Sequence, residues 1–326
     1  MLSDDSQVLL LLCSHLGLSK DDDLTPLTLR EWNALARKIQ LSALNRPEGL
    51  LGQPVTDIKK QLELPEVEAE RLVRLLSRDA SLHNELERLA SRGIRVMTRA
   101  DTDYPQRYRI RLKDSAPVVL FYAGEPALLG QPGIAVVGSR HLDQIGQECA
   151  TFVGNACGLS GLVLYSGGAK GVDTISMNAA LEARGSAVGI LADSLERSIR
   201  NTEVRSAVNR GDLCLATPYT PNAGFSVGAA MGRNRLIYCL ADYAIVVASD
   251  FEKGGTWAGA VETLKAGWIP VFVLIHPLVP EGNRPLIQRG GIAFPHPFPE
   301  HYSKLPAWLQ ENGHSVKPKP TQLGFF

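Results

Sequence analysis

The sequence lacks the cysteine and histidine patterns that mark disulfide-bonded or metal-binding proteins. Its seven histidines show no metal-ligand spacing, so no metal site is predicted. The five cysteines are odd in number, scattered and without a C-x-x-C pair, which is typical of a reducing compartment: Cys13, Cys149, Cys157, Cys214 and Cys239.

Long hydrophobic runs are also absent. No segment approaches the ~18 apolar residues of a membrane span. The N-terminus opens with Ser3-Asp4-Asp5 before a short apolar run, Val8 to Leu12, whereas a signal peptide has a basic start and a longer apolar core. We therefore expect a cytoplasmic protein that does not contact a membrane.

An excess of one charge is missing too. The 326 residues carry 34 lysines and arginines against 34 aspartates and glutamates. No global field draws such a chain to a polyanion, so any nucleic-acid binding must come from a local basic patch. The length and the hydrophobic content of 44% are ordinary for a globular protein of two domains with at least one large core.

Two enzyme motifs are absent. No G-x-G-x-x-G follows the first strand of the regular region, which argues against a dinucleotide oxidoreductase, and there is no G-x-x-x-x-G-K-[ST] of a P-loop ATPase. No nucleophile–base pair can be assembled either. We therefore expect binding without bond breaking, and no cofactor.

A regular alternation of strands and helices begins at residue 134. Apolar runs predict strands that start near Ile134, Val163, Ala187, Leu213, Ala244 and Val271, with helical stretches between them. This alternation indicates an α/β fold with a doubly wound, mostly parallel sheet. Ligands of such sheets gather at the carboxyl ends of the strands.

The first of these strands ends in a turn suited to an anion. Residues 134–140 read Ile-Ala-Val-Val-Gly-Ser-Arg. Gly138 permits the tight turn, Ser139 and the amides after it can face an anion, and Arg140 offers a planar fork for phosphate. An arginine that merely pairs with an acid or caps a carbonyl is the alternative.

A second glycine turn follows the next strand, within residues 164–173. Gly167 and Gly168 form the turn, Ser166 adds a hydroxyl and Lys170 adds a point charge. Asp173 falls in the first turn of the following helix, a position that the helix dipole favours for an acid. We interpret it as a residue that orders the loop.

Two later elements complete the predicted anion-binding surface. Arg233, Asn234 and Arg235 lie in a helical stretch that is otherwise apolar, although a solvated charged face remains an alternative there. Gly254 and Gly255 open another helix, whose amides could complete an anion cup. Polyanion binding, to nucleic acid above all, is the leading interpretation.

Together these motifs resemble the DNA-processing protein A family, DprA, also called Smf. The resemblance rests on residues 136–140, 166–173 and 232–237, with Tyr104-Pro105 and residues 117–124 as a lead-in. It covers most of residues 100–275 in the expected order. The resemblance implies an extended Rossmann-like domain that binds the backbone of single-stranded DNA through Ser139, Arg140, Lys170, Arg233 and Asn234.

The resemblance also implies partners. Family members dimerise and help to load the RecA recombinase during transformation. This chain departs from the family pattern at Ser176 and Met177, where alanine and histidine are usual, and at the turn 254–257. It also has no segment suited to the C-terminal winged helix of many relatives. Recombination, repair and defence against foreign DNA therefore stay open beside transformation.

The resemblance and the helical pattern together predict three segments. Residues 1–80 form a helical domain, like a SAM or helix-hairpin module, in which Thr28 to Glu31 resembles a capping box. A structural cap is favoured there over a DNA or partner module. Residues 81–285 form the Rossmann-like domain, and residues 286–326 form a proline-rich C-terminal segment and tail.

The tail holds a further motif. Gln322, Leu323, Phe325 and Phe326 resemble the short peptide by which bacterial proteins dock on the replication sliding clamp. Equally, the two phenylalanines could fold back onto the core of the protein itself.

Two other functions use similar glycine turns. A phosphoribohydrolase-like enzyme would need an acid close to the ribose, and Glu262 is the nearest candidate after the Gly254-Gly255-Thr256 turn. A nucleotide sensor would bind one mononucleotide without chemistry. The distances between Arg140, Lys170 and Arg233 in the folded protein would distinguish these alternatives, because a DNA strand needs basic groups spread along a groove and a mononucleotide does not.

Overall fold

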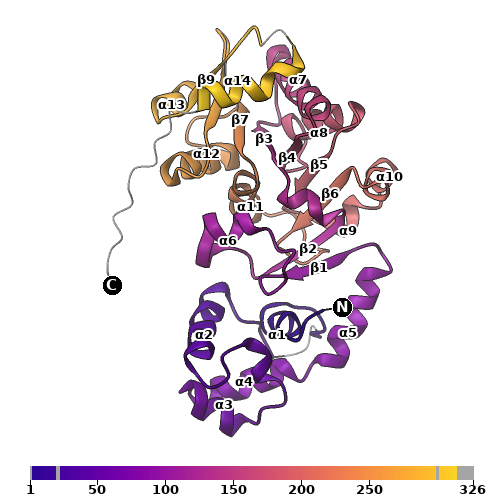
Figure 1. Ribbon diagram of the computed structural model, residues 1–326, viewed down its shortest axis with the longest axis vertical. Helices are drawn as coiled ribbons and strands as arrows, with labels where there is room; N and C mark the ends of the chain where they lie inside the picture. Colours follow the sequence, from indigo (N-terminus) through magenta and orange to yellow (C-terminus); the bar gives the residue numbers. More distant parts are fainter. Residues whose placement is uncertain (1, 20–22, 299–300, 314–326) are drawn as a thin grey trace. The chain divides into compact units, whose positions relative to one another are not determined.

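The computed structural model describes residues 2–19, 23–298 and 301–313. The chain divides into two compact units (Figure 1). Unit 1 comprises residues 1–123 with 218–221, and unit 2 comprises residues 124–217 with those from 222 onward. The predicted boundary at residue 80 is therefore not a boundary between units, because the segment that follows it packs with the helices before it. The predicted tail motif, residues 322–326, lies outside the described residues.

Unit 1 consists of helices and one antiparallel pair of strands. Strands β1 (Arg95–Thr98) and β2 (Val119–Gly124) pair in antiparallel fashion. The helices, with the bounds that the structure gives, are α1 (Asp4–Cys13), α2 (Leu29–Leu41), η1 (Pro47–Leu50), α3 (Val55–Leu62), α4 (Glu66–Leu76), α5 (Asp79–Ala90), α6 (Gln106–Leu112) and η2 (Lys113–Ser115).

Helix α1 forms the core of unit 1. Its apolar run from Val8 to Leu12 is buried and contacts α2, α4, α5 and β1. The run is therefore a core helix, which explains why it is apolar yet short. The capping box predicted ahead of α2 is present, since Thr28 and Glu31 bond reciprocally, and Trp32, Leu35 and Ile39 form the buried face.

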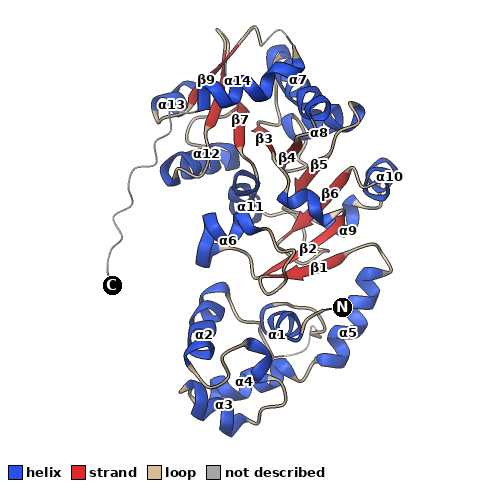
Figure 2. Cartoon of the chain, viewed as in Figure 1, coloured by secondary structure: helices blue, strands red, loops and turns tan. Residues whose placement is uncertain are grey.

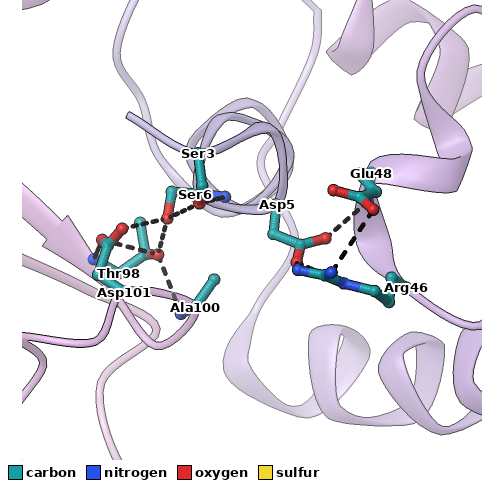
Figure 3. Close-up of polar contacts among 8 residues, drawn as sticks. All are labelled: Ser3, Asp5, Ser6, Arg46, Glu48, Thr98, Ala100 and Asp101. Atoms are coloured by element: carbon teal, nitrogen blue, oxygen red, sulfur yellow. Dashed lines mark hydrogen bonds and ion pairs between the residues drawn. The ribbon is translucent and has the colours of Figure 1, made fainter. Parts of the chain in front are cut away.

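Polar contacts fasten α1 on two sides (Figure 3). On one side the Ser6 hydroxyl donates to Asp101 Oδ1 at 2.5 Å, and the Thr98 hydroxyl donates to Ser6 Oγ at 2.9 Å. On the other side Asp5 accepts from the Glu48 amide at 2.9 Å and pairs with Arg46. Ser6 is fully buried, so the two bonds on the first side satisfy a hydroxyl that water cannot reach.

Unit 2 holds seven strands whose neighbours all run parallel, in the order β6-β5-β4-β3-β7-β8-β9. The strands are β3 (Gly133–Gly138), β4 (Val163–Ser166), β5 (Ala187–Ile190), β6 (Leu213–Thr217), β7 (Tyr243–Ala248), β8 (Val271–Ile275) and β9 (Ile292–Pro295). The predicted α/β fold with a mostly parallel sheet is confirmed. Six of these strands start within one residue of their predicted positions.

Helices of unit 2 surround this sheet (Figure 2). They are η3 (Pro126–Gly130), α7 (Gln144–Ser160), α8 (Val172–Glu182), α9 (Leu195–Ser198), α10 (Thr202–Arg210), α11 (Val227–Leu240), α12 (Gly254–Ala266), α13 (Asn283–Gln288), η4 (Tyr302–Lys304) and α14 (Leu305–Asn312). The chain builds outward from β3 through β4, β5 and β6, then returns to place β7 on the other side of β3. The strand order therefore reverses between β3 and β7, which is the switch point where such sheets bind ligands.

The proline-rich stretch after residue 286 is more ordered than predicted. It contains β9, which pairs with β8, and α14, whose Leu305 and Leu309 are fully buried. Trp308 of α14 lies 5.5 Å from Phe272 and 5.4 Å from Phe294, measured between ring centroids. The described part of this segment thus belongs to the core of unit 2 instead of forming a separate piece.

None of the described helices is both long enough and apolar enough to cross a membrane.

Candidate nucleic-acid interface

A pocket of about 350 Å³ opens at the switch point of unit 2. Its walls come from the turn after β3, the turn after β4, the first half of α11, and the loop and first turn between β7 and α12. The structure thus brings together parts of all four motifs that the sequence singles out. Each wall lies at the carboxyl end of a strand or at the start of a helix.

The turn after β3 is held by backbone contacts that need glycine. A β-carbon at Gly138 would overlap Val172 at the start of α8. The Ser139 amide donates to the Ala248 carbonyl at 2.9 Å, which extends the pairing of β3 with β7. Ser139 Oγ accepts from the His141 amide at 3.2 Å, so this hydroxyl shapes the turn. Arg140 follows and is exposed on the pocket wall.

The turn after β4 packs against the turn after β3. Gly171 has φ +90°, and a β-carbon there would lie 2.5 Å from the Ser139 carbonyl oxygen and 2.7 Å from Arg140 Cα. Only glycine accepts both this backbone conformation and this close approach. The sequence motif contains Gly171, but its role as the contact between the two turns emerges only from the fold.

Asp173 lies beneath the second turn. Its Oδ2 accepts from the amides of Gly167 at 3.2 Å and Ala169 at 3.3 Å. Burial raises the pKa of this carboxyl, and the charge of Arg233 together with the amide hydrogen bonds opposes that rise. These are the contacts that a loop-ordering carboxylate makes, and they occupy Asp173 inside the protein.

Arg233 and Asn234 project from α11 toward different walls. The guanidinium of Arg233 is buried against the backbone of Gly167, where a β-carbon would overlap it. A β-carbon at Gly255 would lie 2.6 Å from Asn234 Nδ2, so Asn234 packs on the first turn of α12. The two side chains thus join α11 to both the β4 turn and the α12 turn. Arg235 does not line the pocket.

Two helix N-termini contribute to the pocket. Helices α8 and α12 both begin without a side-chain cap, and residues at their starts line the cavity. At α8 the amides of Val172 and Thr174 donate to the carbonyls of Ser139 and Ala169, so the start of α12 is the better placed of the two for an anion. Uncapped amides and the helix dipole favour an anion at such a point. Lys253, exposed and directly before α12, adds a positive charge at the same rim.

Several predicted site residues lie elsewhere. Ser166 is fully buried and donates to the Val136 carbonyl at 2.7 Å, so its hydroxyl holds β4 to β3. Gly168 and Lys170 are exposed beside the pocket but do not line it. Glu262, the acid of the hydrolase alternative, is exposed in α12 and is likewise not part of the lining.

The lining residues that were not predicted include Phe225, His141 and Lys253. Nothing in the local sequence marks these residues as part of a site, because only the topology of the sheet brings their loops together. Residues 224–228 also spell G-x-S-x-G, a pattern that marks a nucleophile elbow only after a strand. Here no strand directly precedes it, and Ser226 caps α11 by accepting from the Ala229 amide at 3.1 Å.

The chemistry of the pocket suits an anion. Its lining includes the basic residues Arg140, Arg233 and Lys253, and the acids Asp173 and Asp250. Asp173 is engaged by amides and by the charge of the buried Arg233, so Arg140, Lys253 and the start of α12 supply the positive charge at the cavity, with the exposed Asp250 as the one acid left beside them in the lining. Among the described residues no group of three or more His, Cys, Asp or Glu side chains is arranged to hold a metal ion.

The family model of DNA recombination-mediator protein A matches residues 95–295, which is more than half of the chain. Among curated relatives, the DNA processing protein DprA of Streptococcus pneumoniae is 31% identical over 179 residues, which are 54% of this chain and 60% of that protein. DprA of Bacillus subtilis is 25% identical over 58% of this chain and 67% of the relative. A putative DprA of Mycobacterium tuberculosis is 28% identical over 55% of this chain, which spans half of that relative's length.

Solved structures share the fold. The crystal structure of S. pneumoniae DprA has a TM-score of 0.62 at 24% identity and covers 82% of this chain and 95% of its own. A DprA structure from Helicobacter pylori, described for its single-stranded DNA binding mode, has a TM-score of 0.54 at 23% identity and covers 68% of this chain and 97% of its own.

Proposed function

The chain belongs to the DNA recombination-mediator protein A family, and on that premise we propose that it is a cytoplasmic protein that binds single-stranded DNA by its backbone, without catalysis. The strand lies on the pocket at the switch point of unit 2. Arg140 and the amides at the start of α12 contact phosphates, and Lys253 and Lys170 add charge on either side.

The observation that supports this proposal most is the meeting of exposed positive charge with uncapped helix amides in a single cavity. Arg140 is exposed on one wall and Lys253 on another, and α12 begins between them without a cap. Contacts of this kind recognise phosphate and carry no sequence information. We therefore expect binding that tolerates any sequence and weakens steeply with salt.

The test is the affinity for a fluorescent single-stranded oligonucleotide across a salt series. Arg140→Ala is expected to weaken binding at least ~10-fold, since a hydrogen bond between charged groups contributes about 1.5–3 kcal/mol. It should also flatten the dependence of log K on log salt, by about one contact. The matched control is Arg205→Ala, which removes the same charge from an exposed position on α10 outside the pocket. Equal affinities for the two variants would contradict the proposal.

Partners of this chain are further proposals. We propose that it dimerises and hands bound strands to RecA, as the family resemblance implies, and that its last residues dock on the sliding clamp. Sedimentation tests the dimer. A RecA filament assay with Arg140→Ala tests the transfer of strands to RecA. A pull-down of the sliding clamp with Phe325→Ala and Phe326→Ala tests the docking of the last residues. The process served, whether transformation, repair or defence, follows from which partner binds.

A further inference from the structure

Arg140 lies in a loop that joins β3 to α7 and is anchored at both ends. At the β3 end the Ser139 amide donates to the Ala248 carbonyl at 2.9 Å. At the other end Asp143 is the N-cap of α7, and its Oδ1 accepts from the Gly146 amide at 2.7 Å. A β-carbon at Gly146 would lie 3.1 Å from that oxygen, so glycine leaves room for the carboxylate. The position of Asp143 therefore limits where Arg140 can lie.

The side chain of His276 contacts Asp143. His276 directly follows β8, and its side chain is only 1% exposed. Its Nδ1 accepts from the Leu278 amide at 3.3 Å, so the neutral ring carries its proton on Nε2. Nε2 lies 3.4 Å from Oδ2 of Asp143, the oxygen that the helix cap does not use. The two oxygens of this carboxylate thus face two different partners.

The N–H at Nε2 of His276 has a reason to attract this carboxylate. Within the described part of the chain it makes no aligned hydrogen bond. An N–H that is buried without an acceptor costs free energy, and a negatively charged acceptor close by reduces that cost. Asp143 supplies such an acceptor. The ring therefore holds Asp143, and with it the α7 end of the loop, close to the end of β8.

The segment that His276 begins also supports the second wall of the pocket. At its far end Asn283 is fully buried, and its Nδ2 donates to one carbonyl each of β7 and β8 at 3.0 and 2.8 Å. Its Oδ1 accepts from the amide of Ser249, which opens the loop that leads to α12. Residues 276–283 thus connect the ends of β7 and β8 to both loops of the pocket, and His276 makes the contact on the side of β3.

We propose that His276 is a positioning residue for the phosphate contact of Arg140. This rests on the proposed function and adds to it: His276 holds Asp143, Asp143 fixes one end of the loop, and the loop presents Arg140 to the strand. His276 is buried and does not line the pocket, so it touches no phosphate itself. A binding group keeps its geometry only if the residues behind it are themselves fixed by packing and hydrogen bonds.

The two ring nitrogens of His276 can be replaced one at a time. Glutamine places an amide N–H near the position of Nε2, whereas asparagine places an amide oxygen near that of Nδ1. His276→Gln therefore keeps the donor toward Asp143, and His276→Asn removes it. The affinity for a fluorescent oligo-dT should fall about 3- to 10-fold in His276→Asn and stay within about 2-fold of wild type in His276→Gln.

A change at Asp143 tests the same contact from the other side. Asp143→Ser keeps a hydroxyl that can cap α7, but this side chain is too short to reach the His276 ring. Its affinity for oligo-dT should therefore fall as much as that of His276→Asn. The side chain of Asp143 is 39% exposed, so this variant is expected to fold even if the substitutions at the buried histidine do not.

A double-mutant cycle shows whether His276 acts through Arg140. In the Arg140→Ala background His276→Asn should have no further effect on affinity. In the Lys253→Ala background it should keep its full effect, because Lys253 lies on the other wall. His83→Asn is the matched control: His83 lies 3.2 Å from Glu87 on α5 with its side chain 70% exposed, and its loss should leave binding unchanged.

Each outcome supports or overturns the role of His276. If His276→Asn and Asp143→Ser both bind like wild type, His276 has no positioning role while backbone binding stands. The same holds if His276→Gln binds as weakly as His276→Asn, or if the loss persists in full in the Arg140→Ala background. If wild-type protein binds no oligo-dT at low salt, the proposed function fails and the role of His276 fails with it. Unchanged thermal unfolding of the variants shows that a loss is one of binding.

Discussion

The guanidinium of Arg233 lies directly against the backbone of Gly167, where a β-carbon would overlap its Nη1 atom. Arg233 comes from α11 and Gly167 from the end of β4, so this contact joins two walls of the pocket. Arg233 is 5% exposed, and its charge acts on the carboxyl of Asp173. Arg233 therefore connects two walls of the pocket as a buried side chain, whereas the side chain of Arg140 is exposed to solvent.

Gly167→Ala should disturb this junction. The added methyl group displaces a buried guanidinium, and overpacking of this kind costs about 1–3 kcal/mol of the free energy of unfolding. Urea unfolding measures the loss, and binding of oligo-dT should fall with it because the β4 turn moves. Gly130→Ala is the control, since a β-carbon there meets no atom within 4 Å. Equal stability of the two variants would show that the position of the Arg233 guanidinium does not depend on the absence of a side chain at residue 167.

Gly171→Ala tests the contact between the two anion-binding turns. Its φ of +90° strains any other residue, and the new methyl group would press on Ser139 and Arg140. Gly211→Ala is matched to it, because Gly211 has φ +82° with open space around it, so its cost of about 1–2 kcal/mol reports backbone strain alone. Gly171→Ala should cost more in stability and should also weaken DNA binding, which Gly211→Ala should not do. A Gly171→Ala protein that binds normally would contradict the account of the turn.

Ser6→Ala should loosen α1 from β1. The hydroxyl donates to the Asp101 carboxylate and accepts from Thr98 in a buried setting (Figure 3). A hydrogen bond to a charged group contributes about 1.5–3 kcal/mol, and a loss near 2 kcal/mol in the free energy of unfolding is expected. Ser115→Ala, at an exposed position in the same unit, should change stability by less than about 0.5 kcal/mol. DNA binding through unit 2 should be unchanged in both variants.

Glu31 gives a pH dependence with a defined sign. Hydrogen bonds from Arg71 and from the Thr28 amide lower the pKa of this carboxyl from 4.5 to about 2. A lowered pKa in the folded state means that the stabilisation is present above pH 4.5 and is lost as the pH falls toward 2. Because Glu31 is partly exposed, we expect about 1 kcal/mol. Glu31→Gln should be less stable than wild type at neutral pH, and in urea unfolding the difference should shrink below pH 4.5 and vanish only as the pH reaches about 2.

The control for this pair is Glu68→Gln, an exposed acid in the first turn of α4. Its difference from wild type should stay small at every pH. A Glu31→Gln deficit that persists unchanged at low pH would mean that packing, and not the charge, carries the effect.

The sequence predicts the sheet of unit 2 well because each inner strand is an apolar run bounded by glycine or polar residues. It misses β9 because Ile292 to Pro295 is short and ends in proline. The unit boundary escapes prediction for a different reason. The bond from Ser6 to Asp101 spans 95 residues, and no local pattern reports such a contact.

The candidate site is predictable in part. Glycines after buried strands indicate where turns meet, and the residues Gly138 to Arg140 do line the pocket. The direction of each side chain depends on packing, which the sequence does not show. Ser166 was predicted as a site residue, but its hydroxyl points into the sheet and donates to the Val136 carbonyl. Phe225 lies in a loop whose position is set by the reversal of strand order, a property of the whole fold.

The most direct test of the central claim is a crystal structure of the full chain with a short oligo-dT. The account predicts a phosphate within hydrogen-bond distance of the Arg140 guanidinium and of the amides of Gly254 and Gly255, in the pocket between β3 and β7. A strand bound on another surface, with this pocket empty, would contradict it.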